Sequence, residues 1–526
     1  MKMIIVNKNT HKKWKITSFE KIYRKSGLFF WQLQGDNPKN IKSIHDPWKG
    51  NSENFKDFDS KIYYLKKTNN FSLFYWIRDV RDYNKNISRN KIRNIILDWF
   101  ERHNYWNQNE WRPDFLSQRI SNLMFTFQWF GNSADDSFQQ TFLKYLLPQF
   151  RCLSVDWKKL HEDIDKLDAL KSLIVFQSTI SNSNNELNLL LEIFSKILER
   201  QLNLDGGHKT RQPEVHLKLI KILIECRMSL SSYKVTKLKF LDDVIRKAIS
   251  VCKVWIHGNG EFAHFNFAGE TKAIEIKKIL EWRSLKFKIP QHLKYTGFTR
   301  FYLGRNTLIF DTGSISNDKN DCPASALAFE FSVGKSMLVV NSSQNSENIK
   351  LRNLLSQTIA HSTLSIDNLN SKDFINNRFS NSLKSEVGEA KGGLLLSCSH
   401  NGYMKTHGII HTRKMFLSSD GKDLRGNDHL EYNGAPGEIP SFAIVRFHLH
   451  PHVSARISNN KQIILKIRTH NSGWLFKTEN CKLYLDKSIY LKDNQKISTQ
   501  QIILQIPLTN IQSVGNISIN WAFKKI

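Results

Sequence analysis

Residues from about 60 to 285 repeat their apolar positions with the period of an amphipathic helix. The clearest stripe recurs at i, i+4, i+7, i+11 and i+14, with Asp114 as its expected N-cap and Gly131 as its stop. Two further helices are predicted, one before Leu204 and one after Pro213. Such helices joined by short loops predict an all-helical array or toroid over residues 61–288. The stripes are Leu116, Ile120, Leu123, Phe127 and Phe130; then Leu187, Leu190, Leu191, Phe194, Ile197 and Leu198; then Val215, Leu219, Ile222 and Leu223.

After about residue 290 the apolar period changes to two, which is typical of β-strands. Gly, Asn and Asp bound the runs F-Y-L-G-R-N-T-L-I-F-D-T-G, A-L-A-F-E-F-S-V-G-K-S-M-L-V-V-N and K-Q-I-I-L-K-I-R, and W-L-F-K and Q-Q-I-I-L-Q-I-P follow. These runs predict an antiparallel β-sandwich over residues 289–526, with the domain boundary around Pro290. Residues 1–60 mix short apolar runs with polar stretches, and we expect an irregular N-terminal segment there.

Composition supports more than one domain and a polyanionic partner. A chain of 526 residues is too long for one ordinary core. The net charge of +29 favours nucleic acid, anionic lipid or acidic polysaccharide. The excess is largely Lys spread along the chain without a block of five or six, so a dedicated nucleic-acid arm is not expected. The six cysteines form no CxxC pair and match neither a zinc site nor a small disulfide scaffold.

The densest group of candidate binding side chains lies in residues 399–428. The alternation is strand-like and puts His411 and Arg413 on one face, and His400 precedes them. Asp420–Gly421 predicts the turn of a hairpin. A face that carries His and Arg suits an anionic ligand, and it equally suits a solvated sheet face.

Two loops in the helical half also carry candidate chemistry. In the first, Asp205–His208 ends a helix, and Lys209 and Arg211 follow on a turn. These cations either bind an anion or compensate the helix dipole. The second loop, Gly258–Glu270, places polar side chains between aromatic ones. It is either a buried structural loop or the rim of a sugar cleft.

Several motifs, in their order and spacing, carry a family resemblance. The chain resembles the heparinase II/III-like family of polysaccharide lyases over most of its length. That resemblance implies an N-terminal α/α toroid followed by an antiparallel β-sandwich, the architecture that periodicity predicts separately. The motifs are W-R-P-D-F-L-S-Q-R-I, L-D-G-G-H-K-T-R-Q-P-E-V-H, A-L-A-F-E-F-S-V-G, A-H-S-T-L-S-I-D, H-N-G-Y…H-G-I-I-H-T-R and R-F-H-L-H-P.

The resemblance implies cleavage of acidic polysaccharides by β-elimination. A base removes the proton next to a uronate carboxylate, an acid protonates the departing glycosidic oxygen, and the carboxylate must be neutralised. Family members use a Tyr and one or more His for proton transfer, with Asn, His or Arg on the carboxylate. The cleft of the family lies between the toroid and the sandwich.

This chain departs from the family pattern at its central motif, where Val215 stands in place of the expected Tyr and His216 follows. The remaining histidines His208, His361 and His400 are expected to meet in one cleft between the two domains. The predicted catalytic residues are His208, His361 and His400, and the predicted substrate-binding residues are Trp111, Arg119, Arg211, His411 and Arg413.

A metal site is an alternative to a site without cofactor. His448 and His450 lie at i and i+2 of a predicted strand, a spacing that can hold a divalent metal such as zinc. A third ligand would be needed, such as His400 or Asp311. Otherwise no cofactor is expected.

Two functions follow, and they belong to different classes. The first is a carbon–oxygen lyase that cleaves uronate-containing, heparin- or heparan-like or other anionic polysaccharide by β-elimination. The alternative is a catalytically degenerate relative that binds polyanionic glycans or supports cell-envelope polysaccharide handling. No motif supports a nucleic-acid partner.

Location and assembly remain open from sequence. The N-terminal apolar run of four residues is too short for a signal-peptide core, and no segment reaches the length of a membrane span. A cytoplasmic protein is the default expectation, and the cell envelope or periplasm is the alternative that the family suggests. Oligomeric state is not predicted.

Overall fold

The structure is a computed structural model, and its chain divides into two compact units. One unit comprises residues up to Gln201 together with Lys218–Ile245, and the other comprises Leu202–Leu217 together with Arg246–Ile526. The predicted boundary near residue 288 stays a prediction. The structure describes residues 16–526 apart from 36, 37, 39, 40, 56, 69, 84–88, 162, 181–183, 232–235, 286, 314–322, 343–345, 347, 373–381, 435–438, 470 and 471.

Helix α6 (Pro113–Phe130) shows how the helical period is realised. Its stripe is fully buried, and the Gly131 N–H closes the helix on the Phe127 carbonyl at 2.6 Å. The predicted N-cap was wrong by two residues: Arg112 is the cap, because Pro113 at the first position needs no hydrogen-bond partner for its nitrogen. Asp114 lies in the first turn instead and accepts two hydrogen bonds from Arg112.

The remaining helices follow the predicted order, and two more appear within the segment that was expected to be irregular. There Thr17 and Ser26 cap α1 and α2 through their hydroxyl groups, while residues 1–15 lie outside the described residues. The α-helices are α1 (Ser18–Lys25), α2 (Gly27–Gln32), α3 (Phe58–Lys66), α4 (Trp76–Tyr83), α5 (Arg89–Arg102), α6, α7 (Asp136–Asp156), α8 (Ile164–Ile180), α9 (Asn184–Gln201), α10 (Pro213–Ser229), α11 (Thr236–Cys252), α12 (Ala273–Leu280), α13 (Ile349–Leu355), α14 (Met404–His407) and α15 (Ile511–Val514).

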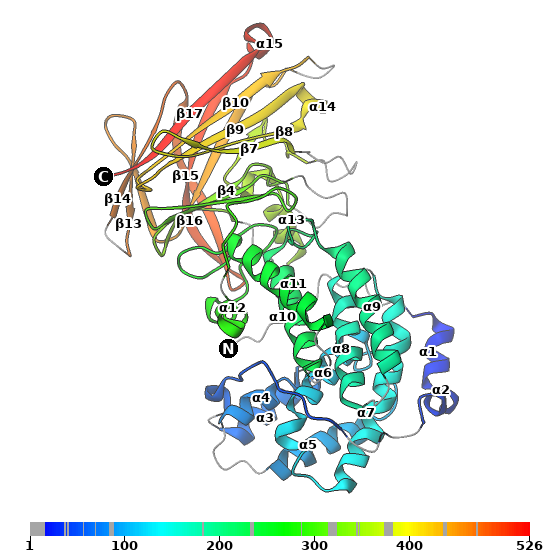
Figure 1. Cartoon of the computed structure of the whole chain (residues 1–526). Coiled ribbons are helices and arrows are strands. Elements are labelled where there is room, and N and C mark those ends of the chain that lie inside the picture. Colours follow the sequence, from blue (N-terminus) through cyan, green and yellow to red (C-terminus); the bar gives the residue numbers. More distant parts are fainter. Residues whose placement is uncertain are drawn as a thin grey trace. The chain divides into compact units, whose positions relative to one another are not determined.

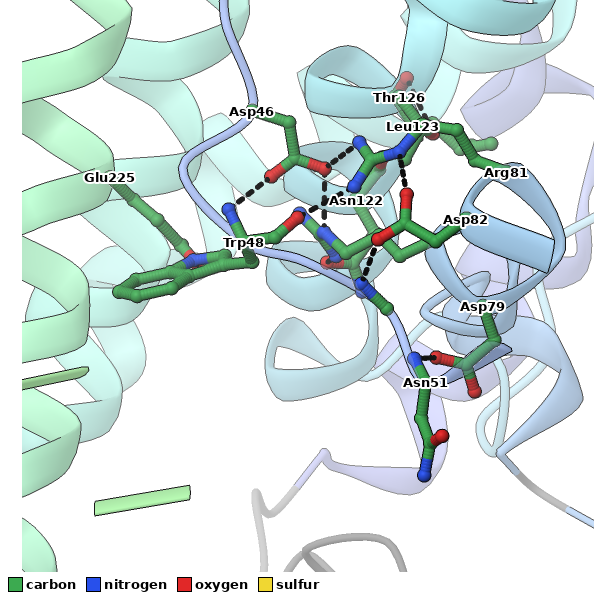
Figure 2. A network of polar contacts seen from close by, with 12 residues as sticks. Asp46, Trp48, Asn51, Asp79, Arg81, Asp82, Asn122, Leu123, Thr126 and Glu225 are labelled. Carbon is green, nitrogen blue, oxygen red and sulfur yellow. Dashed lines mark hydrogen bonds and ion pairs between the residues drawn. The ribbon is translucent and has the colours of Figure 1, made fainter. Parts of the chain in front are cut away.

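A polar network ties the extended segment after α2 to the helices of its unit (Figure 2). Asp46 accepts hydrogen bonds from Arg78 and Arg81, each at 2.8 Å, and Arg81 also donates to the Trp48 carbonyl. The Trp48 indole donates to Glu225 at 2.7 Å. Because these charged groups are largely buried, the pairs fix the path of a segment that has no regular structure of its own.

The strands form two antiparallel sheets within the described residues (Figure 1). One has the order β1-β2-β3-β4-β5-β11-β16-β15, with β6 paired to β11, and the other has the order β12-β13-β14-β17-β10-β9-β8-β7. The strands are β1 (His292–Leu293), β2 (Phe298–Leu303), β3 (Asn306–Asp311), β4 (Phe329–Val333), β5 (Ser336–Val340), β6 (Leu364–Ile366), β7 (Ser382–Ala390), β8 (Gly393–Tyr403), β9 (Ile409–Ser418), β10 (Asp423–Tyr432), β11 (Phe442–Leu449), β12 (Val453–Ile457), β13 (Ile463–Ile467), β14 (Ser472–Thr478), β15 (Lys482–Lys492), β16 (Gln495–Pro507) and β17 (Asn516–Lys525).

One hydrophobic core combines residues of both sheets, such as Phe331 and Val445 from the first and Leu417 and Trp521 from the second. Helices followed by two packed antiparallel sheets confirm the predicted fold class. Closure of the helices into a toroid stays a prediction. In the described part of the chain, none of the helices combines the length and apolar character that a membrane crossing needs.

Candidate functional site

The predicted His/Arg face of β9 forms a buried polar chain across three adjacent strands. His400 of β8 lies opposite His411 of β9, and Arg413 of β9 lies opposite Asp428 of β10. His400 Nε2 is 3.1 Å from His411 Nδ1, and His411 Nε2 is 2.7 Å from Asp428 Oδ1. Arg413 donates to both carboxylate oxygens of Asp428, at 2.7 and 3.0 Å. The Trp521 indole donates to the same carboxylate at 2.8 Å.

These contacts fix the tautomers of both histidines. The Gly402 N–H donates to His400 Nδ1 at 3.0 Å, so His400 carries its proton on Nε2 and donates to His411 Nδ1. His411 then donates from Nε2 to Asp428. Burial is the main cause that lowers the pKa of His400 and of His411, so both are neutral at pH 7. No ring nitrogen of either histidine is left for a substrate in this arrangement.

The sequence predicted that this face either binds an anion or lies in solvent. Neither alternative foresaw that the face is buried. Ile409, Met415 and Leu417 share the face with His411 and Arg413, and all five are buried. Apolar neighbours on the same side of the strand turn that side toward the core between the sheets. The roles predicted for His400, His411 and Arg413 at a substrate stay predictions.

The loop that carries His208 and Arg211 is anchored to the sheet of its own unit. Arg211 donates to the Thr296 carbonyl at 2.8 Å and forms a buried ion pair with Asp311 of β3. Its guanidinium fork therefore already holds a carboxylate, one supplied by the protein itself. The Thr210 N–H donates to His208 Nδ1 at 3.2 Å. Burial, followed by the nearby His216, lowers the pKa of His208 to about 3.

His361 differs from the other predicted histidines because its ring is only weakly hydrogen-bonded, with a contribution from the Leu355 backbone. It follows a 3-10 turn at Thr358–Ala360 and is fully buried. Neither ring nitrogen has a hydrogen-bond partner of normal geometry among the described residues. Burial, followed by the neighbouring His448, lowers its pKa to about 3. His208, His361 and His400 all lie in the second unit, and their convergence in one cleft stays a prediction.

Replacing His361 by leucine is expected to preserve stability at pH 7 and to reduce its loss in acid. An unpartnered buried polar group costs free energy, so an apolar replacement of similar size is nearly neutral or stabilising. In the wild type the unfolded state protonates His361 near pH 6.5, while the folded state resists protonation down to about pH 3. Unfolding is therefore favoured as pH falls through this window, by about 1.4 kcal/mol per pH unit for one proton.

Urea unfolding of the wild type and His361→Leu at pH 7, 6, 5 and 4 measures this slope. His429→Leu is the matched control, because His429 of β10 is only partly buried and is bonded to Ser518. A variant that is several kcal/mol less stable at pH 7 would show that His361 has a partner that supports it.

The pair His448 and His450 does not fit a shared metal ion. His448 Nε2 donates to the Ile359 carbonyl at 3.0 Å, and its Nδ1 is 2.8 Å from Ser488 Oγ. His450 Nδ1 accepts the His452 N–H at 3.2 Å. Among the described residues, no three His, Cys, Asp or Glu side chains gather in a way that could hold a metal ion.

Trp111 and Arg119, predicted to bind substrate, lie buried in the first unit and act on neighbouring backbone and side chains. The Trp111 indole donates to the His103 carbonyl at 3.3 Å. Arg119 donates to the Ser72 carbonyl at 2.7 Å and pairs with Glu110 at 2.9 Å. Both side chains thus hold segments that line a pocket, which is described below.

A tyrosine–histidine group that the sequence did not reveal lies in the second unit. Tyr490 of β15 has its Oη 3.4 Å from His264 Nε2, and the two rings stack with centroids 5.0 Å apart. The ring of His450, which lies just after β11, meets the Tyr490 ring edge-on, with the two ring centroids 5.0 Å apart. Lys492, two residues further along the chain, is half exposed and pairs with Glu261 at 3.3 Å. The group therefore combines a phenol and two imidazoles with a cation near solvent.

The loop Gly258–Glu270 and the preceding His257 contact β4 and the turn that follows it. His257 bonds to Ser332 and Glu330 of β4, at 2.9 and 3.2 Å. An added Cβ on Gly258 would lie 2.0 Å from the Gly334 carbonyl oxygen, so only glycine permits this close approach. The sequence allowed either a buried structural loop or the rim of a sugar cleft. The His264 side chain fits the first interpretation, because it is 7% exposed. The sequence analysis singled out the loop that contains His264, but no motif pointed to Tyr490, which is 226 residues further along the chain.

The environment sets distinct protonation states within this group. Burial lowers the pKa of His264, although Glu330 and Glu261 oppose the shift. Burial, followed by His452 and His264, lowers the pKa of His450 to about 3. Burial, together with Glu330 and Glu261, raises the pKa of Tyr490 above its ordinary value. At pH 7 a protonated phenol thus adjoins two neutral imidazoles, a combination of proton donor and proton acceptor.

Solved structures with a similar fold include a heparan sulfate lyase and heparinase III. The heparan sulfate lyase HepC from Pedobacter heparinus matches with a TM-score of 0.66 and 16% identity, over 90% of this chain and 78% of that one. A heparinase III structure matches with a TM-score of 0.65 and 16% identity, over 87% and 77% of the two chains. At this identity the likeness establishes the fold alone.

Comparison of the sequence with family profiles gives one match. Residues 288–522 match the family profile described as Heparinase II/III-like, C-terminal. Residues 288–522 therefore carry a C-terminal domain of the heparinase II/III-like family, as the motifs had suggested. FtsZ-localized protein C of Caulobacter vibrioides (strain NA1000 / CB15N) is a relative, 22% identical over 476 residues, which cover 86% of this chain and 81% of that protein.

Proposed function

We propose that this protein cleaves a uronate-containing polysaccharide by β-elimination, with Tyr490 as proton donor and His264 as proton acceptor. One observation carries the proposal: a phenol and an imidazole lie 3.4 Å apart in a chain whose family Tyr is replaced by Val215. Such a reaction needs one protonated acid and one deprotonated base at the start, and their environments favour these two states.

The proposed step moves one proton in and one proton out. His264 Nε2 takes the proton from the carbon next to the uronate carboxylate, and the electron pair of that C–H bond forms the new double bond. The bond to the glycosidic oxygen breaks, and the Tyr490 hydroxyl supplies the proton to that oxygen. A bound carboxylate also raises the proton affinity of a nearby imidazole, which offsets the low basicity that burial imposes on His264.

Neutralisation of the uronate carboxylate is assigned to His450 and Lys492. Because His450 Nδ1 accepts the His452 N–H, its proton resides on Nε2 and can donate to a carboxylate. Lys492 is half exposed and its partner Glu261 is a carboxylate, which a substrate carboxylate would replace. Such donors stabilise the charge that develops when the proton leaves.

Incubation with a panel of uronate polymers tests the proposal. The panel contains heparin, heparan sulfate, chondroitin sulfate, hyaluronan, alginate and polygalacturonate. We expect at least one to give a steady rise in ultraviolet absorbance, because β-elimination leaves an unsaturated sugar. Absence of any rise, alongside measurable binding of a polymer, would instead support the catalytically degenerate alternative.

The alternative has its own supporting observation. Each histidine predicted from sequence to be catalytic is at most 3% exposed, and His400 has both ring nitrogens occupied. The relative from Caulobacter vibrioides is named for its localisation with FtsZ, not for cleavage of a polysaccharide. If cleavage is found and does not depend on Tyr490, His361 becomes the preferred proton acceptor, because its ring nitrogens form no hydrogen bond of normal geometry among the described residues.

A further inference from the structure

A small pocket in the first unit has a basic rim and an aromatic floor. Its volume is about 210 Å³, and its lining includes Lys66, Lys67, Phe71, Trp99 and His103. Pockets that enclose drug-sized ligands measure about 300–1,000 Å³. This one is therefore sized for a single small group.

The floor of the pocket is built from stacked rings that deeper residues hold in place. The His103 imidazole stacks on the Trp99 indole with centroids 4.4 Å apart and planes 10° from parallel. The Arg119 guanidinium lies 4.2 Å from the centre of the same indole. His103 Nδ1 donates to the Trp99 carbonyl at 2.8 Å, and Trp111 donates to the His103 carbonyl. The floor is thus rigid before any ligand binds.

The charges of the pocket are only partly compensated. Arg102 pairs with Asp98 at 2.6 Å, and Arg119 pairs with Glu110 at 2.9 Å. Lys66, in the last turn of α3, forms no ion pair among the described residues. The Lys67 ammonium donates to the Tyr63 hydroxyl at 2.8 Å and lies 4.1 Å from the centre of that ring, and it forms no ion pair with the residues that the structure describes. Two ammonium groups therefore border the pocket without a carboxylate partner within the described part of the chain.

We propose that this pocket binds one anionic group of a sugar, a sulfate ester or a carboxylate, with Lys66 and Lys67 as its charge partners. Sugars present an apolar ring face together with charged substituents, and the pocket offers an aromatic floor beside two ammonium groups. The α3 C-terminal carbonyls disfavour an anion, but the two lysines outweigh this partial negative charge. The inference is independent of the proposed cleavage, because it involves none of the residues assigned to proton transfer.

Binding of sugars that cannot undergo β-elimination tests the pocket separately from cleavage. Sucrose octasulfate carries sulfate esters without a uronate, lactobionate carries one carboxylate, and lactose carries no charge. We expect calorimetric titration to show binding of one or both charged sugars and none of lactose. The double variant Lys66→Ala/Lys67→Ala should weaken binding about tenfold or more, since each lost contact involves a charged group.

The matched control is Lys277→Ala/Lys278→Ala on α12, which removes the same charge from exposed positions far along the chain. This control should change the dissociation constant less than twofold. Equal weakening by both double variants would mean diffuse attraction to a chain of net charge +29, and would overturn the proposal. Unchanged binding in Lys66→Ala/Lys67→Ala would overturn it as well. Displacement by inorganic sulfate at similar concentration would assign the site to the sulfate group rather than to the whole sugar.

Discussion

Replacing Tyr490 by phenylalanine is expected to lower the cleavage rate by about 10²–10⁴-fold, the usual contribution of a positioned proton donor. The substitution removes only the hydroxyl group, so the ring still stacks on His264 and still meets His450. The initial rate of the absorbance rise, on whichever polymer the panel identifies, measures the loss. Because the hydroxyl acts in the transition state, kcat should fall while KM changes little.

Tyr484→Phe is the control for this prediction, since Tyr484 lies on the same strand and is 41% exposed. It should retain the wild-type rate. If Tyr490→Phe retains the rate as well, Tyr490 does not supply the proton, and the proposed site is wrong. A rise in KM without a fall in kcat would instead assign Tyr490 to substrate positioning.

Replacing Asp428 by asparagine is expected to destabilise the protein by about 3–5 kcal/mol, the cost of leaving a buried charge without its partner. Asp428 accepts hydrogen bonds from His411, Arg413 and Trp521, all within the core between the sheets. An amide cannot accept from all three and cannot neutralise Arg413. Denaturant unfolding followed by tryptophan fluorescence measures the loss.

Asp423→Asn is the matched control on the same strand, β10. Asp423 pairs with Arg425 at 2.6 Å, but the Arg425 side chain is 65% exposed. Exposed pairs contribute about 0–1 kcal/mol, so this variant should be nearly as stable as the wild type. Equal effects of the two substitutions would show that the buried network stabilises the sandwich no more than a surface pair does.

Acid should affect the Asp428 network in a defined direction. Burial alone would raise the pKa of Asp428, but Arg413 and His411 outweigh it and hold the pKa below its ordinary value. The carboxylate therefore contributes stability above about pH 3.9, the ordinary pKa of Asp, and loses it as pH falls toward the folded-state pKa. Asp428→Asn should lack this acid-dependent loss.

The family resemblance and the fold class were accessible from sequence because both rest on local patterns. The stripe of α6 needs only a period of 3.6 residues, and the alternation of β9 needs only a period of two. Gly131 ended its helix as predicted because glycine is a poor helix former at any position in any fold. The motifs that suggested the heparinase II/III-like family are likewise short and contiguous.

The tertiary structure alone decided which face of a strand is buried and which distant side chains meet. Periodicity placed His411 and Arg413 on one face, but only the packing of the other sheet against it made that face part of the core. Tyr490 and His264 are 226 residues apart, and no local pattern pairs them. The same holds for Trp99 of α5 and Arg119 of α6, which meet across two helices. Local sequence determines periodicity and turns, whereas burial and proton affinity depend on neighbours that folding brings together.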